Sequence, residues 1–332
     1  MIAARHRTVL IAALGLLALA AAIGSLLLGP VPLSLPRMVA AFTGNGDRVV
    51  TSILFDLRLP RTILGLAVGA MLGLSGAALQ GYLRNPLAEP SVLGTSTAAA
   101  LGAVGTIYFG LALVHPLILP VMAVLAALAS LVLLFLLAGR SESPLTLILA
   151  GIALMTLASA GISLSLNLSP NPVAAMEIMT WLLGSLENRS FDHVRVALPC
   201  IAIGAAMLLW HGRALDALTL GEDGAQALGI DLRATRLRLL LGTAIGVGGA
   251  VAVSGAIGFV GLIVPHLIRP LTDRSPSAIL LPSAIGGAAL LTLADLAVRL
   301  IDTKAELKLG VVTAFLGVPV FLVHLMRERR LW

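Results

Sequence analysis

The chain has 332 residues, of which 58% are hydrophobic and only 11% are charged, and its mean hydropathy is +1.03. A soluble domain carries about 25% charged residues, so this composition excludes an ordinary soluble protein. The formal net charge of +6 does not indicate a nucleic-acid partner, because the basic residues stand mainly at the ends of apolar segments. The sequence predicts an all-α polytopic protein of the lipid bilayer, with residues 1–332 as a single transmembrane domain.

Apolar segments between charged residues predict the membrane crossings. The first, Val9–Leu28, follows Arg5 and Arg7, and its 20 uncharged residues favour a retained span over a cleaved signal peptide. The later candidates are Thr62–Leu83, two crossings within Pro90–Gly139 that separate near Tyr108–Pro116, Ser143–Met176 with an outer segment, Val196–Gly212, Leu239–Ile268, Ser275–Ala294 and Leu309–Met326.

Leu239–Ile268 is ambiguous because its 30 uncharged residues are too many for one ordinary crossing and few for two. With a cytoplasmic N-terminus, six crossings place the arginine-bearing stretch Arg213–Arg238 inside, as the positive-inside rule expects. A second crossing near Phe259–Ile268 also brings the C-terminal arginines, including Arg329 and Arg330, inside. The sequence therefore predicts ten transmembrane helices with both termini cytoplasmic.

The second crossing carries a stripe of small residues. Its glycines recur at spacings of four, four and three, at Gly65, Gly69, Gly73 and Gly76. Such a stripe lets another helix backbone approach closely in lipid. We expect Gln80 to face protein or water, because an amide facing lipid is costly. We expect Asn85 and Pro86 to end this helix, and Pro265 to end or kink the short crossing near the other end of the chain.

An internal repeat aligns Ser75-Gly76-Ala77 with Ser254-Gly255-Ala256, and Pro86 with Pro265. The two copies enter the membrane from opposite sides, so we expect an inverted repeat with halves of approximately 58–168 and 236–326. Inverted repeats are a common plan of membrane transporters.

Three arginines lie on the predicted outer side, where the positive-inside rule disfavours them. They are Arg58, Arg61 and Arg299. One interpretation is contact with lipid phosphates at the interface. The other is a docking patch for an acidic soluble partner. Asp295 is four residues before Arg299 on a predicted helix, so the two side chains can form a structural ion pair.

The largest predicted cytoplasmic loop contains a short helix. Gly221 ends one helical turn, and Glu222 begins the next, where an acidic residue suits the helix dipole. Ala225, Leu228 and Gly229 give this helix a small apolar face, which indicates a protein partner. The alternative is a loop lying on the membrane surface.

Six sequence stretches resemble the permease family of iron-siderophore, haem and vitamin B12 importers. They are RLPR, SGAALQGYLRNPLAEPSVLG, LGEDGAQALGI, GFVGLIVPHLIR, ADLAVRL and ELKLGVVTAFLGVPVFL. The resemblance runs from about Leu57 to Arg327 and implies the membrane subunit of an ABC importer, a homodimer in the bacterial inner membrane. It implies two ATPase subunits on the cytoplasmic side, which bind ATP and Mg²⁺, and a soluble substrate-binding protein outside.

The resemblance also implies roles for residues. It assigns Glu222–Gly229 to the coupling helix that contacts the ATPase, and Arg58, Arg61 and Arg299 to contacts with the binding protein. It implies a pore at the dimer interface, lined by the fifth and tenth crossings and by the outer segment that contains Trp181–Gly184. The chain itself would bind no cofactor or metal and would be a transport subunit rather than an enzyme, since it has no phosphate-loop pattern.

Two other function classes stay open at this point. An ion-coupled secondary transporter with inverted repeats needs a buried ionisable residue, and Asp295 is the candidate. A membrane scaffold or receptor subunit needs neither a repeat nor a coupling helix. The motifs do not separate siderophore, haem and cobalamin importers. The resemblance favours an iron(III)-siderophore as substrate, because that branch of the family is the most populous.

Overall fold

A computed structural model describes residues 2–115, 117–139, 144–301 and 306–328, which form helices and turns without a strand. The helices in chain order are α1 (Ile2–Leu27), α2 (Leu35–Phe42), α3 (Arg48–Ser52), the π-helix η1 (Ile53–Arg58), α4 (Leu59–Leu83), the 3₁₀ helix η2 (Pro90–Leu93), α5 (Thr95–Tyr108), α6 (Leu111–Val114), α7 (Ile118–Ala138), α8 (Pro144–Asn167), α9 (Pro172–Leu182), α10 (Phe191–Trp210), α11 (Gly212–Leu218), α12 (Glu222–Ala227), α13 (Leu232–Ser254), α14 (Val260–Ile268), the 3₁₀ helix η3 (Arg269–Leu271), α15 (Pro276–Leu300) and α16 (Leu309–Glu328).

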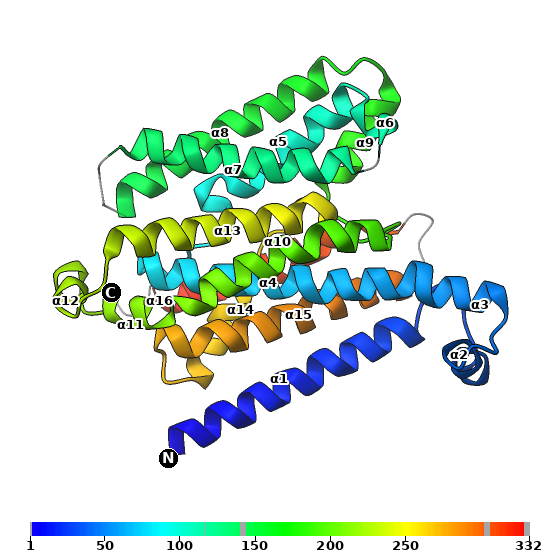
Figure 1. The fold of residues 1–332 in the computed structure, drawn as a ribbon, viewed down its shortest axis with the longest axis horizontal. Coiled ribbons are helices and arrows are strands. Elements are labelled where there is room, and N and C mark those ends of the chain that lie inside the picture. Colours follow the sequence, from blue (N-terminus) through cyan, green and yellow to red (C-terminus); the bar gives the residue numbers. More distant parts are fainter. Residues whose placement is uncertain (1, 116, 140–143, 302–305, 329–332) are drawn as a thin grey trace.

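The long helices lie side by side in one elongated bundle (Figure 1). Helix α4 is central and packs on α15, α14, α10 and α13, while α1 packs on the outside of α15. Helices α5, α7 and α8 form a further layer that α7 joins to α13 (Figure 1). The core between these layers is built from small residues and aliphatic side chains, so the helices approach closely.

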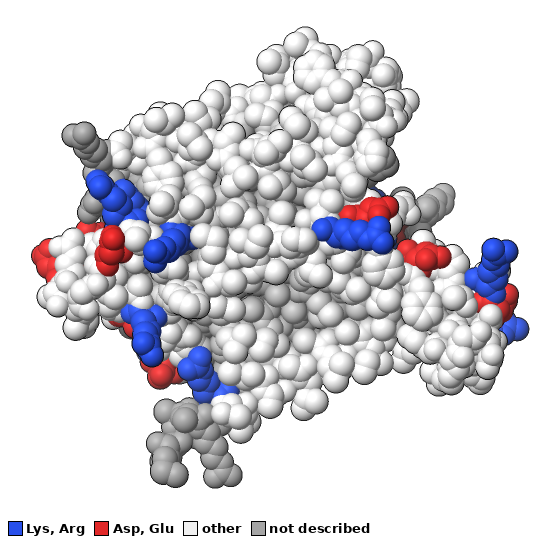
Figure 2. Space-filling view, viewed as in Figure 1, with Lys and Arg blue, Asp and Glu red and all other residues white. Residues whose placement is uncertain are grey.

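Seven of the described helical segments are long and apolar enough to cross a membrane. On the face shown in Figure 2, a band without charged side chains crosses the middle of the bundle, and acidic and basic side chains lie toward its two ends. Large apolar side chains such as Leu16, Leu136 and Phe315 are exposed, as expected for a surface that faces lipid. The chain is therefore a multi-pass membrane protein.

The predicted count of ten crossings includes two helices that are short. Helix α5 has 14 residues and α14 has 9, which span about 21 and 14 Å at 1.5 Å per residue. The start of α1, the end of α16 and helices α11 and α12 lie at the same end of the bundle in Figure 1. This placement requires an even number of crossings. Ten crossings remain a prediction, since Arg329 and Arg330, which enter the parity argument, lie outside the described residues.

The break that divides the run Leu239–Ile268 is present. Helix α13 ends at Ser254, the chain turns through Gly255 with a φ of +70°, and α14 begins at Val260. Helix α14 does not end at Pro265, as the sequence suggested it could, but continues to Ile268. Pro265 is the sixth residue of α14 and removes one backbone hydrogen bond, the one to the carbonyl of Gly261, which instead accepts from Gln80 Nε2 at 3.3 Å.

The glycine stripe lies where the sequence placed it, on the face of α4 that touches other helices. A Cβ at Gly69 would overlap the carbonyl of Gly287, and one at Gly73 would overlap the carbonyl of Ser283, both on α15. Gly65 faces Thr292 of α15, and Gly76 faces the backbone of Gly261 on α14. The absence of side chains therefore sets the distance between α4 and its two neighbours.

The polar residues at the end of α4 are satisfied within the protein. Gln80 is buried, donates to the carbonyl of Gly261 and accepts from Arg269 at 2.9 Å. Arg84 takes the left-handed conformation that ends α4, and Asn85 then accepts from the backbone N–H of Leu87 ahead of the 3₁₀ turn η2. Pro86 lies between Asn85 and Leu87, in the turn that follows α4, so the helix ends where the sequence predicted.

The predicted repeat alignment falls on unlike backbone. Ser75-Gly76-Ala77 lies inside α4, which continues for six more residues, whereas Ser254 is the last residue of α13. The residue-level match therefore does not extend to the local helix ends, and the repeat halves 58–168 and 236–326 remain a prediction.

Candidate functional site

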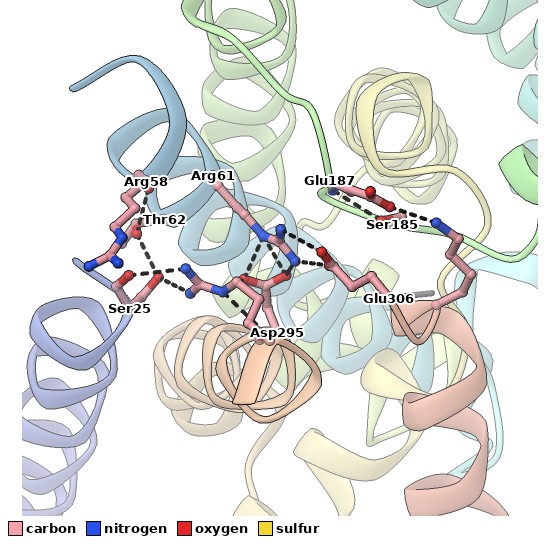
Figure 3. A network of polar contacts seen from close by, with 10 residues as sticks. Ser25, Arg58, Arg61, Thr62, Ser185, Glu187, Asp295 and Glu306 are labelled. Atoms are coloured by element: carbon pink, nitrogen blue, oxygen red, sulfur yellow. Dashed lines mark hydrogen bonds and ion pairs between the residues drawn. The ribbon is translucent and has the colours of Figure 1, made fainter. Parts of the chain in front are cut away.

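We call the end of the bundle where α1 begins the inner end and the opposite end the outer end, after the sides of the membrane that the sequence predicts for them. The outer end contains a buried carboxylate held by two arginines. Asp295 on α15 accepts from Arg61 Nε at 3.0 Å and from Arg61 Nη2 at 2.8 Å (Figure 3). Its other partner, Arg299, lies one turn further along α15, with Nε 3.2 Å from the carboxylate, so the ion pair expected from the four-residue spacing is present. Asp295 is only 2% exposed, which makes this arrangement a buried network rather than a surface pair.

Arg58 joins the same region to the first helix. Its guanidinium donates to the carbonyls of Leu26 and Leu27 at 2.8 Å, and to that of Val31 at 2.6 Å. The last carbonyls of a helix have no partner within the helix, so Arg58 satisfies the end of α1. The π-helix η1, which is continuous with α4, sets the position of Arg58.

Arg299 also contacts α1. It donates to the backbone carbonyl of Ser25 at 3.1 Å and to the Ser25 hydroxyl at 2.6 Å. That hydroxyl is 2.6 Å from the hydroxyl of Thr62 on α4, so one polar cluster joins α1, α4 and α15 (Figure 3).

The network extends to the beginning of α16. Glu306 forms an ion pair with Arg61, opposite Asp295. Two residues later, Lys308 donates to Glu187 at 2.7 Å, and Glu187 lies in the segment between α9 and α10. The outer ends of α4, α15 and α16 and this segment are therefore linked by charged side chains (Figure 3).

The three predicted docking arginines thus come together, but their guanidinium groups bind groups of their own chain. Arg58 is 5% exposed and Arg299 is 7% exposed. Neither has the exposed head group expected of a lipid anchor or of a docking residue. Their docking role remains a prediction. Asp295 is bound by two arginines of its own chain, so the carboxylate has a structural role in joining helix ends.

Two cavities flank this network, and sequence reasoning missed most of their residues. The smaller, about 240 Å³, is lined by all three arginines and by Glu187, Arg189 and Glu306. The larger, about 710 Å³, is lined by α9, including Trp181, and by Arg189 and Lys308. The available signal was the polar run Glu187-Asn188-Arg189 directly after an apolar outer segment, because ionisable residues beside membrane segments often mark functional sites.

The outer segment predicted to line the pore joins the ends of two helices. After Trp181–Gly184, the backbone N–H of Ser185 donates to the carbonyl of Ser254 at 2.8 Å, and that of Gly310 donates to Gly184. The segment is thereby fixed between the end of α13 and the beginning of α16. Its role in lining a pore stays a prediction.

The inner end of the bundle has a different character. Helix α12 begins after Gly221, whose φ is +93°, and its first turn holds Glu222, as the sequence indicated. Ala225, however, is fully buried and does not belong to an exposed apolar face. Alanine is small enough to fit under the short helix, so its Cβ packs inward.

The exposed apolar residues of this loop are leucines instead. Leu228 is 62% exposed and Leu220 is 69% exposed, and they flank α12. Gly229 follows with a φ of +79° and turns the chain toward α13. An aspartate on the preceding helix, Asp216, accepts from the backbone N–H of Ser277 at 2.8 Å and so ties the loop to α15. The loop presents two uncovered leucines on a fixed support, and its contact with an ATPase remains a prediction.

A resident metal has no evident site in the described part of the chain. No group of three or more histidine, cysteine, aspartate or glutamate side chains gathers there in an arrangement that could hold a metal ion.

Comparison with known proteins assigns the chain to a family. The pattern of the FecCD transport family matches residues 16–327. An ABC transporter permease of Bacillus subtilis is 42% identical over 86% of this chain and 82% of its own length. The Fe(3+) dicitrate transport system permease of Escherichia coli is 39% identical over 83% and 86%. The cobalamin import system permease of Halobacterium salinarum is 38% identical over 83% and 74%.

A solved structure supports the same assignment. An inward-facing metal-chelate type ABC transporter superposes with a TM-score of 0.86 and 33% identity, over 96% of this chain and 98% of that chain. This chain therefore belongs to the FecCD transport family and is a permease subunit of an ABC importer.

Proposed function

We propose that this permease imports an iron(III) chelate of the siderophore type across the bacterial inner membrane. It works as a homodimer with both termini in the cytoplasm. Two ATPase subunits bind the inner end, where they hold ATP and Mg²⁺, and a soluble substrate-binding protein docks on the outer end. The chain itself holds no cofactor.

The loop around α12 carries this proposal. Its uncovered leucines, Leu220 and Leu228, lie at the end of the bundle where α1 begins and α16 ends. A soluble ATPase subunit that covers them buries apolar surface, which gives a durable contact. Since Asp216 ties the loop to α15, movement of the loop is passed to the long helices.

The substrate class rests on two relatives. The ferric dicitrate permease and the metal-chelate type transporter both handle chelated metal by name, and both match this chain over most of its length. The cobalamin permease is the competing class at nearly the same identity.

Transport then follows by alternating access. ATP binding closes the pair of ATPase subunits, the α12 loops move with them, and the permease pair changes the side to which its central passage opens. Hydrolysis resets the assembly. Ligand specificity comes first from the binding protein and second from the passage.

Reconstitution in proteoliposomes tests the proposal. The chain, its ATPase and its binding protein should take up ⁵⁵Fe-labelled chelate only with ATP inside the compartment that holds the ATPase, and vanadate should stop uptake. A secondary transporter would instead lose uptake when an ionophore collapses the ion gradient. The ligand that the binding protein retains on purification separates chelated iron from cobalamin and haem.

A further inference from the structure

The short helix α2 at the outer end has two apolar sides, and one of them packs on neighbouring helices. This packed side belongs to a small core of four buried residues on α2, α3 and η1, which are Met38, Ala41, Val50 and Leu54. On the other side, Leu35, Val39 and Phe42 are 56–62% exposed. Their spacings of four and three residues place them together, so α2 presents an apolar face to its surroundings.

The same helix is cationic on the opposite side. Successive residues of a helix are about 100° apart, so Arg37 lies nearly opposite Leu35 and Val39. Arg37 is exposed and forms no ion pair with the described residues. In Figure 2, charged side chains gather at the outer tip of the molecule, whereas the surface over α2 is largely uncharged. An apolar face opposite a cationic one is the pattern of a helix that lies in the membrane interface.

Helix α2 lies at the level where the first membrane helix ends. Leu27, the last residue of α1, packs on the same small core, and Arg58 bonds with its carbonyl. Within that core, Leu54 and Val50 precede Arg58 by four and eight residues, which is about 6 and 12 Å further out at 1.5 Å per residue. A headgroup layer is about 5–8 Å thick, so α2 is at the depth of the phospholipid headgroups.

The apolar face of α2 continues the surface of α1 that faces lipid. In Figure 1, α2 lies beside the outer end of α1 and is seen nearly end on, so its axis crosses those of the long helices. Leu28 and Val31, between the two helices, are about half exposed, and the sequence has no charged residue from Thr8 to Pro36. A soluble partner would have to enter the headgroup layer to cover this face, so phospholipid is the occupant that the geometry favours.

We propose that α2 is an interfacial helix of the phospholipid leaflet at the outer end. Leu35, Val39 and Phe42 insert at the boundary between headgroups and acyl chains, and Arg37 is directed to the phosphates and water. This inference goes beyond the proposed function and does not depend on the substrate. Because α2 packs on α3 and η1, its contact with lipid holds the projecting end of the central helix, from which Arg58 reaches α1.

The first test locates α2 by fluorescence quenching, in the full chain in phospholipid nanodiscs. In a Cys200→Ser background, single cysteines carry an environment-sensitive fluorophore. A label at Val39 should show blue-shifted emission and be quenched by phospholipids brominated on their acyl chains, but not by iodide in the water. A label at Arg37 should show the reverse. Leu16 on α1 is the control for contact with lipid, and Val49, exposed on the projecting α3, is the control for contact with water.

The second test compares the two sides of the helix with a label at Leu35. Val39→Asp places a carboxylate on the apolar face, where insertion would remove it from water, so the label should lose its quenching by brominated lipid. Arg37→Asp introduces the same side chain on the opposite side and should leave the quenching unchanged. Both positions are exposed, so the two variants should unfold in detergent at the temperature of the unchanged chain.

Three results would overturn the proposal. Quenching of the Val39 label by iodide and not by brominated lipid would place α2 in water. If iodide quenched this label until the soluble protein that restores uptake was added, a protein and not lipid would cover the face. Equal loss of lipid quenching in Val39→Asp and Arg37→Asp would mean that the apolar side of α2 does not determine the contact. None of these results bears on whether the chain imports an iron chelate.

Discussion

The two ends of the bundle differ in which side chains they cover and which they leave exposed. At the outer end, arginines are turned inward and bound to carboxylates and helix carbonyls, so the charge is largely covered. At the inner end, two apolar leucines on either side of the short helix α12 stay uncovered. The difference teaches that the arginines of the outer end mainly join helix ends to one another, whereas the inner end keeps apolar surface of the kind that a lasting protein contact buries.

The two ends of the bundle are predicted to lie on opposite sides of the membrane, and thiol labelling tests this. In a Cys200→Ser background, a cysteine at Arg48 should react with an impermeant thiol reagent outside intact cells. A cysteine at Asp273, in the exposed loop before α15, should react only after the cells are permeabilised. The reverse labelling pattern would exchange the outer and inner ends and remove the assignment of α12 to the ATPase.

The outer end should depend strongly on its buried acid. Asp295→Ala leaves Arg61 and Arg299 without their shared carboxylate, and we expect a loss of about 3–5 kcal/mol in the free energy of unfolding. Asp192→Ala removes an exposed pair with Arg195 and should cost less than about 1 kcal/mol. Thermal unfolding in one detergent measures both. Similar losses in the two variants would mean that the buried Asp295 network contributes no more to the free energy of unfolding than an exposed ion pair does.

Arg58 should stabilise the contact between the first helix and the rest of the bundle. Arg58→Gln removes charged donors from the carbonyls at the end of α1 and should cost about 2 kcal/mol, since hydrogen bonds to charged groups contribute about 1.5–3. Hydrogen–deuterium exchange after α1, in residues 28–34, should become faster. Arg37→Gln, an exposed arginine on α2, is the matched control and should leave exchange unchanged.

At the inner end, a change should affect assembly without affecting folding. Leu228→Asp should leave the unfolding temperature unchanged and weaken ATPase binding by about 1–2 kcal/mol, which is about tenfold. Gln226→Asp adds the same charge at an exposed polar position and serves as the control. Ala225→Asp should instead destabilise the chain, because it buries a carboxylate. Unchanged ATPase binding by Leu228→Asp would exclude this leucine from the contact.

Local spacing predicted the features that depend on one helix. The glycine intervals indicated the close face of α4, and the four-residue interval indicated the pair Asp295–Arg299. The partner of Arg61 could not be predicted in this way, because 234 residues separate it from Asp295. Nor could the contacts of Arg58, since its acceptors are backbone carbonyls, which carry no sequence signal.

The interior position of Ala225 also escaped sequence reasoning. Alanine is common on both buried and exposed helix faces, so its direction depends on how α12 is seated. The same limit affects the design of docking tests. Reversing the charge of Arg58 breaks its bonds with α1, so a loss of uptake in that variant would report folding as well as docking.

The contact between α4 and α15 restricts how this transporter can move. A Cβ at Gly69 would overlap the carbonyl of Gly287, and a Cβ at Gly287 would overlap that of Gly69, so the contact is reciprocal. Sliding either helix by one residue would bring a side chain into the space that only glycine permits. We therefore expect α4 and α15 to move together as one rigid body during transport. Other helices would rotate relative to this pair, and the two helices would not slide along each other.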